Sequence, residues 1–285
     1  MFNVNKKINF SFEFFPPVSD ILVERRFWNT IRKLSDFEPD FYSITSGTTT
    51  IRQKKTFDFV KKVVKKTNVN IAVHMTCINN SVSELEEISR NYWNQGIKKI
   101  VALRGDKKEF NNKKMYASDL ISILKKVADF DILVAAYPEV HPEAKNAHSD
   151  LMYLKNKFDC GASKAITQFF FDSEKFFRFR DKCIKNGIYS DIIPGILPVI
   201  NIDQMIRFSR MSNIFIPKWI YEIFNDLSNL DPSVNKLVGQ NITMKIVEDL
   251  FLEGVKKFHF YTLNQYEIPF STCLILKMKK KFKIL

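Results

Sequence analysis

Short apolar segments alternate with longer amphipathic segments along almost the whole chain. Runs of about four to eight mostly apolar residues are typical of buried strands, and apolar positions that recur every three to four residues are typical of helices. This pattern predicts strands over residues 8–13, 41–45, 71–75, 99–103, 132–136, 165–169, 192–196 and 257–261. It predicts helices over residues 19–35, 52–66, 81–94, 115–128, 142–160, 173–186, 202–211, 217–225 and 234–253. Ser81 and Glu84 are expected to form a capping box at the start of the third helix.

The order of these elements predicts an α/β protein, a (β/α)8 TIM barrel. About eight strands, each followed by helix, fit one barrel domain that spans residues 1–285. With 45% hydrophobic residues, the chain can form one large core. The alternative is an open doubly wound sheet, which would need a first turn of the form G-x-G-x-x-G. The 8 glycines of the chain contain no such motif.

Polar residues gather where the predicted strands end. These positions are Glu13, Thr45-Ser46, His74-Met75-Thr76, Arg104-Gly105-Asp106, residues 137–141, Gln168 and residues 261–264. Active sites of barrel enzymes are assembled at the carboxyl ends of the strands. The agreement across most strands therefore indicates a site at this face.

Glu13 stands at the end of the aromatic segment that begins at Phe10 and stops at Pro16 and Pro17. Side chains alternate along a strand, so Ser11 and Glu13 are expected on the face opposite the phenylalanines. Burial among apolar side chains would raise the pKa of Glu13 and favour the protonated form that a general acid needs. The alternative is that Glu13 only pairs with a basic neighbour, and the segment alone leaves both interpretations open.

Two further groups of residues could carry chemistry. In the Arg104-Gly105-Asp106 loop, glycine allows close approach of a ring or phosphate, and arginine can bind an anion, although a simple Arg–Asp pair is equally compatible. His74, His141 and His148, with Glu139, could form a metal site, but their spacing matches no compact zinc motif. Hydrogen bonding to an anionic cofactor suits these histidines better, so we predict no metal.

Charge and cysteine content narrow the function classes. The net charge of +13 is compatible with nucleic-acid binding or with attraction of a small anion. Most lysines are spread over amphipathic segments, and the one dense basic cluster is residues 277–283. We therefore expect no nucleic-acid partner, and a basic nucleic-acid-binding barrel and a metal-dependent barrel hydrolase remain the alternatives. The four cysteines form no Cys-x-x-Cys pair, and no signal peptide or membrane span is evident, so a cytoplasmic protein with reduced thiols is expected.

Six blocks in the same order resemble a known family, that of the bacterial methylenetetrahydrofolate reductases. They are residues 11–17, 101–106, 135–144, 167–172, 194–198 and 260–264. The resemblance covers nearly the whole chain and implies an FAD-containing (β/α)8 barrel without a regulatory domain. It implies a homo-oligomer, with a tetramer as one form.

The resemblance also implies a reaction. NADH, or less readily NADPH, reduces FAD, and the flavin then reduces 5,10-methylenetetrahydrofolate to 5-methyltetrahydrofolate in a ping-pong sequence that supplies methyl groups for methionine synthesis. Glu13 matches the general acid of the family, and Asp106 matches the aspartate that contacts the pterin and tunes the flavin. Gln168, Gln204, Phe208 and Tyr261 match folate-binding positions, Gln168 also touching the nicotinamide. The positions matching FAD contacts are Thr45, His74, Arg104, Gly105, Asp106, Tyr116, Ala117, Tyr137, His141, Ala144, Asp150 and Lys157.

The chain departs from the family pattern at a few positions. Gln265 stands where the family usually has an arginine that pairs with the glutamate tail of the folate, and its neutrality predicts weaker folate binding unless a lysine elsewhere substitutes. Ser46, Thr48, Tyr153 and Asn156 also replace the usual residues. These changes bear on affinity, since Glu13, Asp106 and Gln168 are retained.

Overall fold

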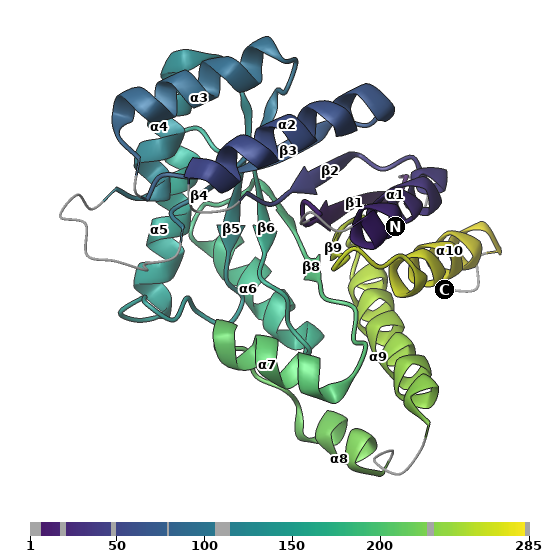
Figure 1. The fold of residues 1–285 in the computed structure, drawn as a ribbon. Helices are drawn as coiled ribbons and strands as arrows, with labels where there is room; N and C mark the ends of the chain where they lie inside the picture. The colour runs from purple at the N-terminus through teal and green to yellow at the C-terminus, as the bar shows by residue number, and fades with distance from the viewer. Residues whose placement is uncertain are drawn as a thin grey trace.

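The computed structural model describes residues 7–17, 21–46, 50–78, 80–105, 115–226 and 231–282. Strands and helices alternate along them, with α8 at the lower end of the view in Figure 1 and α9 packed against α10 and α6. The strands are β1 (Asn9–Phe14), β2 (Phe41–Ile44), β3 (Ile71–Thr76), β4 (Lys99–Leu103), β5 (Asp131–Ala136), β6 (Lys164–Thr167), β7 (Asp191–Ile193), β8 (Gly195–Ile196) and β9 (Lys257–Tyr261). The helices are α1 (Ile21–Leu34), the 3-10 helix η1 (Ser35–Phe37), α2 (Thr50–Lys66), α3 (Val82–Asn94), α4 (Ala117–Val127), α5 (Ala147–Asp159), α6 (Ser173–Lys185), α7 (Ile202–Ser212), α8 (Lys218–Asp226), α9 (Pro232–Leu252) and α10 (Glu267–Phe282).

All strand pairs in the described residues are parallel, in the order β7-β6-β5-β4-β3-β2-β1-β9-β8. The two outermost strands of this order are consecutive in the chain and are separated only by Pro194. Proline has no N–H to donate, so it interrupts the ladder, and the strand predicted over residues 192–196 is divided in two. The Pro194 carbonyl accepts a hydrogen bond of 3.0 Å from the His259 N–H, so this divided strand brings the sheet round to β9. The predicted (β/α)8 barrel is confirmed as a nearly closed ring of eight strand positions.

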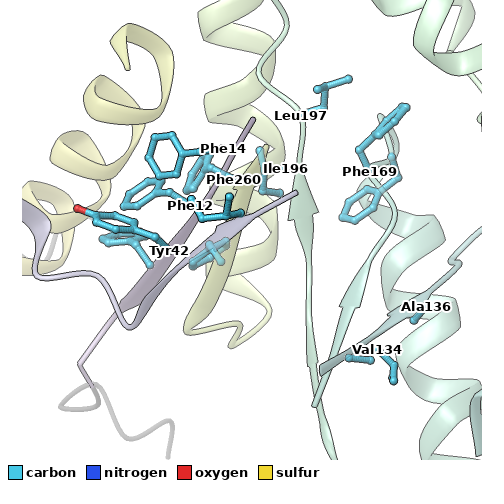
Figure 2. Close-up of a cluster of buried hydrophobic side chains, with 14 of the residues drawn as sticks. Phe12, Phe14, Tyr42, Val134, Ala136, Phe169, Ile196, Leu197 and Phe260 are labelled. Carbon is cyan, nitrogen blue, oxygen red and sulfur yellow. The ribbon is translucent and has the colours of Figure 1, made fainter. Parts of the chain in front are cut away.

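The core has two layers because side chains alternate across each strand. Inside the barrel, Phe41, Ala72, Val101, Leu133 and Ile166 form a small cluster, one from each strand from β2 to β6. The outward side chains pack under the helices in a much larger cluster. Figure 2 shows part of it, with Phe12, Phe14, Tyr42 and Phe260 grouped where β1, β2 and β9 lie side by side. The phenylalanines of β1 therefore face the helices, and Ser11 and Glu13 face the interior, as the alternation predicts.

Helix boundaries follow local capping, which confirms some predictions and corrects others. Ser81 and Glu84 form the predicted capping box, in which the Ser81 N–H donates to the Glu84 carboxylate at 2.7 Å. The helix predicted from residue 142 begins only at Ala147, because the Asn146 side chain caps it by accepting the Ser149 N–H at 2.9 Å. Residues 142–146 thus belong to the loop after β5, at the active-site face of the barrel.

The basic segment near the carboxyl end packs partly against the barrel. Within α10, Lys277 donates to the Phe37 carbonyl at 3.3 Å, and Lys279 forms an ion pair with Glu248. These contacts direct two lysines of the cluster toward the fold. No helix in the described ranges has the length and apolar character that crossing a lipid bilayer requires.

At the other end of the barrel, Asp131 joins neighbouring strands. It pairs with Lys99 of β4 and, at 3.3 Å, with Lys164 of β6. Burial raises the pKa of Asp131, but hydrogen bonds from Lys99 and Ser163 and the charges of both lysines lower it to about 2. This cluster lies at the amino ends of the strands, the face that contributes to stability in barrel folds.

Candidate active site

A cavity of about 290 Å³ opens at the carboxyl ends of the barrel strands. Its lining consists of Glu13, Phe15, His74, Val101, Leu103, Val134, Ala135, Tyr137, Ile166, Gln168, Phe169, Leu197, Phe208, Tyr261 and Leu263. Most of these side chains are apolar or aromatic, and the few polar ones come from different strands. Such a lining suits a flat ring system that a small number of polar groups orient.

Glu13 occupies the wall of this cavity because of its strand register. On β1 it lies level with Ser43 of β2 on one side and with Tyr261 of β9 on the other. Its side chain is only 12% exposed. The carboxylate is therefore held inside the barrel mouth, and the aromatic residues beside it in sequence face away from it.

Two imidazoles flank the Glu13 carboxylate. Its Oε2 lies 3.3 Å from Nε2 of His74 and 3.8 Å from Nε2 of His259. Burial raises the pKa of Glu13, but the charge of His74 and the contacts with both histidines outweigh this effect and lower the pKa to about 2. The predicted raised pKa is therefore wrong in direction, since strands distant in sequence place two imidazoles beside the carboxylate within the apolar cavity. At neutral pH Glu13 is ionised in the ligand-free protein.

His259 is a member of the site that the sequence interpretation missed. It lies within the barrel on β9 with a fully buried side chain, and its ring stacks on Phe41 at 5.7 Å between centroids. Its Nδ1 lies 2.8 Å from Oγ of Ser11, and its Nε2 lies 3.5 Å from Oγ of Ser43. The alternation of side chains along residues 257–261 was the available signal, because His259 shares the inward face with Tyr261.

Hydrogen bonds hold Gln168 and Tyr261 in the cavity wall, Tyr261 beside Glu13 and Gln168 just after β6. The Gln168 side chain accepts the Phe169 N–H at 3.1 Å and donates to Ser212 at 3.3 Å. The Tyr261 hydroxyl donates to the Thr167 carbonyl at 2.7 Å. Strand β6 ends at Thr167, two residues earlier than predicted, and this leaves the Gln168 side chain free to line the cavity.

The predicted folate positions on α7 differ in placement. Phe208 lines the cavity, and Gln204 lies one turn earlier, at the start of the helix. The Gln204 N–H donates to the capping side chain of Asn201 at 2.8 Å. Phe208 and Glu13 therefore line the same cavity. Gln204 lies on the same face of α7 but is not part of the cavity lining.

A second cluster of polar residues lies beside the cavity, where β4 and β5 end. Arg104 makes a bidentate pair with Glu143, with both nitrogen–oxygen distances at 2.7 Å. The His141 N–H donates to Asp150 at 2.9 Å, and Lys157 Nζ donates to the Ala135 carbonyl at 2.9 Å. Burial lowers the pKa of Lys157 to about 8, against the opposing charge of Asp150.

Several of these residues also constrain one another's orientation. The Glu143 N–H donates to Nδ1 of His141 at 3.0 Å, so the proton of the neutral ring is on Nε2. The ring of Tyr137 meets that of His141 edge-on, with centroids 4.5 Å apart. Burial lowers the pKa of His141, which keeps this ring neutral at physiological pH. The group therefore offers an Nε2–H donor and two cations beside an apolar cavity.

Gly105 allows the backbone to pass close to β3. Its φ is +92°, and a Cβ there would lie 2.5 Å from Ile78 and 3.1 Å from Thr76. Only glycine fits both the conformation and the space.

The remaining predicted cofactor positions lie on several elements. Thr45 follows β2, where its N–H donates to the Phe14 carbonyl at 3.0 Å. Tyr116 caps α4 and is half exposed, Ala117 is buried at the first turn, and the Ala144 N–H donates to the His141 carbonyl at 2.9 Å. Asp106, predicted to act on both substrate and flavin, lies outside the described residues, as does Thr48.

His74, His141 and His148 do not form one metal site in the part of the chain that the structure describes. Across the described ranges, no three His, Cys, Asp or Glu side chains come together in a metal-binding arrangement. His148 is exposed on α5, away from the Glu13 cavity lining. All four cysteines are free thiols.

Comparisons with known sequences identify one protein family. The sequence profile of the methylenetetrahydrofolate reductase family matches residues 2–278. A 5,10-methylenetetrahydrofolate reductase from Buchnera aphidicola subsp. Acyrthosiphon pisum (strain APS) is 54% identical over 276 residues, which are 96% of this chain and 94% of that protein. The enzyme of the same name from Escherichia coli (strain K12) is 50% identical over 277 residues, 97% of this chain and 93% of that protein.

A solved structure shares the fold. An uncharacterized protein from Clostridium thermocellum, described as binding two copies of 5-methyl-5,6,7,8-tetrahydrofolic acid, superimposes with a TM-score of 0.65 and 16% identity, covering 97% of this chain and 96% of its own. At this identity the likeness concerns the barrel alone. The profile match and the near-full-length relatives at about half identity show that the chain belongs to the methylenetetrahydrofolate reductase family.

Proposed function

We propose that the protein reduces 5,10-methylenetetrahydrofolate to 5-methyltetrahydrofolate, with electrons from NADH or NADPH passed through bound FAD. The observation that carries the proposal is the Glu13 carboxylate, held in an apolar cavity at the active-site face of a barrel from this family. The Clostridium protein of the same fold, described as binding 5-methyltetrahydrofolic acid, is a further support for a folate ligand.

The residues beside the cavity fit FAD. Val101, Leu103 and Ala135 offer an apolar surface to its ring. Lys157 uses one of its three N–H donors on the Ala135 carbonyl, so the others are directed elsewhere. Arg104, His141 and Lys157 would hold the diphosphate, where charge-assisted hydrogen bonds are strong. When bound, FAD supplies the hydride chemistry that no side chain can perform.

Glu13 is proposed to be the general acid. Protonation of a folate nitrogen opens the five-membered ring of the substrate and leaves a cationic iminium carbon that can accept a hydride. Because Glu13 is ionised at rest, it must acquire a proton once the substrate has displaced water from the cavity. The apolar lining residues Phe15, Leu197, Phe208 and Leu263 would exclude water, together with the bound substrate, while this proton moves.

A ping-pong order requires that nicotinamide and pterin use the same side of the bound flavin in turn. The polar groups that line the cavity, Glu13, His74, Gln168 and Tyr261 among them, would then serve both ligands. Gln168 is in position to contact either, since its side chain lines the cavity.

The two half-reactions test the proposal separately. Purified protein should be yellow, should be bleached by NADH or NADPH without oxygen, and should regain its colour with methylenetetrahydrofolate. Glu13→Gln should retain the first step and slow the second by about 10²- to 10⁴-fold, the usual contribution of a general acid. Glu139→Gln, a control at the same barrel face but outside the cavity lining, should retain both. Protein that stays colourless after reconstitution with FAD would refute the proposal.

Assembly and physiological role follow from the same proposal. The methyl group of the product would serve methionine synthesis, and the protein would act as a homo-oligomer. Light scattering coupled to size-exclusion chromatography tests the assembly, because a monomer of 33.4 kDa is readily told apart from a dimer or a tetramer.

A further inference from the structure

His259 is a titratable side chain with no solvent exposure, enclosed by strands β1, β2 and β9. A buried histidine is often only a packed core residue. Here both ring nitrogens face polar atoms, and one of them faces the proposed general acid.

One assignment of the hydrogen bonds around the ring places the proton on Nδ1. When the Ser11 hydroxyl donates to the Phe258 carbonyl at 3.3 Å, its oxygen accepts from His259 Nδ1 at 2.8 Å. The neutral ring then carries its proton on Nδ1 and has a lone pair on Nε2. The Ser43 hydroxyl, 3.5 Å from Nε2, can donate to that lone pair.

This lone pair points into a small set of ionisable groups. Nε2 lies 3.8 Å from Oε2 of Glu13 on β1, and the same oxygen lies 3.3 Å from Nε2 of His74 on β3. Tyr261 on β9 meets the His259 ring edge-on, and burial raises its pKa well above the ordinary value, so it stays neutral. Among the described residues, Glu13 is thus the carboxylate with which His259 can exchange a proton.

We propose that Glu13 and His259 hold one proton between them, and that His259 is the positioning residue from which Glu13 obtains the proton it passes to the substrate. The inference rests on the proposed function. In the transfer, the Nε2–H bond breaks and an Oε2–H bond forms. The Oε2–H bond then breaks as the proton bonds to the folate nitrogen, and a neutral imidazole and a carboxylate remain.

The pair regains its proton from water between turnovers. Glu13 and His74 are each 12% exposed at the cavity, and His259 is not exposed at all. Protons therefore enter through the cavity when it is empty and are retained when a ligand closes it. Burial lowers the pKa of His259 and Glu13 raises it, and burial has the larger effect, so this pKa lies below its ordinary value. The pair therefore gains its proton more readily as the pH falls.

The test is the rate of the folate half-reaction between pH 5.5 and pH 8.5, measured by rapid mixing with reduced enzyme. For His259→Asn we expect a loss of about 100-fold or more at pH 7.5 and of less than about tenfold at pH 5.5, where solvent protonates Glu13 directly. The half-reaction with NADH should stay within about twofold of wild type. Ser11→Ala should shift the pH profile in the same direction by a smaller amount.

Several results would overturn the inference. An unchanged pH profile in His259→Asn would do so, as would an equal loss at every pH, which indicates a structural role. A shift produced by His74→Asn and absent from His259→Asn would assign the proton to the other imidazole. If His259→Asn does not fold, ¹⁵N NMR of the wild-type ring decides, because a neutral ring protonated on Nε2 contradicts the proposed pair. Wild-type protein with no flavin or no folate half-reaction would instead refute the proposed function.

Discussion

Lys157 provides a quantitative test of the FAD site. Its ammonium group is buried at the end of β5, bonded to the Ala135 carbonyl, and burial lowers its pKa to about 8 from the ordinary 10.5. The charge is therefore present below pH 8 and is lost above it. A bound diphosphate would restore the charge, since an anion favours the protonated form.

The difference between the pKa of Lys157 in the free protein and in the FAD complex sets the expected change in FAD affinity with pH. Above pH 8, each pH unit should weaken FAD binding about tenfold until the pKa of the liganded group is reached. Between pH 8 and pH 9.5 the Kd of the wild-type protein for FAD should therefore rise by up to about 15-fold, because half of the charge is already lost at pH 8. Lys157→Gln removes the charge altogether and should raise the Kd at pH 7 by about 10- to 100-fold, the range for a hydrogen bond to a charged group.

The assay is quenching of FAD fluorescence by apoprotein at pH 7, 8 and 9.5. Lys157→Gln should bind weakly and show little dependence on pH over this range. Lys155→Gln, two residues earlier on α5, is the matched control and should follow the wild type. If Lys157→Gln keeps the wild-type pH dependence, this lysine does not hold the cofactor and the reasoning fails.

Three further predictions concern other parts of the molecule. Asp131→Asn should destabilise the protein by about 1–2 kcal/mol at pH 6. Because the pKa of Asp131 is lowered to about 2 in the fold, its contribution is present above the ordinary 3.8 and is lost as the pH falls toward 2, so urea unfolding at pH 3 should show a smaller difference. Gly195→Ala should cost about 1–3 kcal/mol or more, because its Cβ would lie 2.1 Å from the Thr167 carbonyl oxygen; thermal unfolding measures this, and a neutral effect would contradict the close approach. Gln265→Arg should lower the KM for folate about fivefold, because the arginine would form a partly exposed charge-assisted hydrogen bond with the glutamate tail. Flavin reduction by NADH should not change, and an unchanged KM for folate would exclude that contact.

Local sequence was sufficient for the order of the elements as far as β9, whereas helix α10 (Glu267–Phe282) was not predicted. The positions of β4 and β9 agree with their predicted ranges, and the Ser81–Glu84 capping box forms as expected. These features depend on residues a few positions apart, so the periodicity of the chain contains them. The gathering of polar residues at one end of the barrel also follows, because parallel strands bring all their carboxyl ends to the same face.

The electrostatics of the site were decided by tertiary structure. Glu13 is 61 residues from His74 and 246 from His259 in the chain, yet both imidazoles lie within 4 Å of its carboxylate. Strand register creates these contacts, and the histidines reverse the pKa direction that the flanking phenylalanines suggest. The sequence shows which residues carry polar groups to the carboxyl ends of the strands. The protonation state of each group depends on distances between strands, and no local sequence pattern encodes those distances.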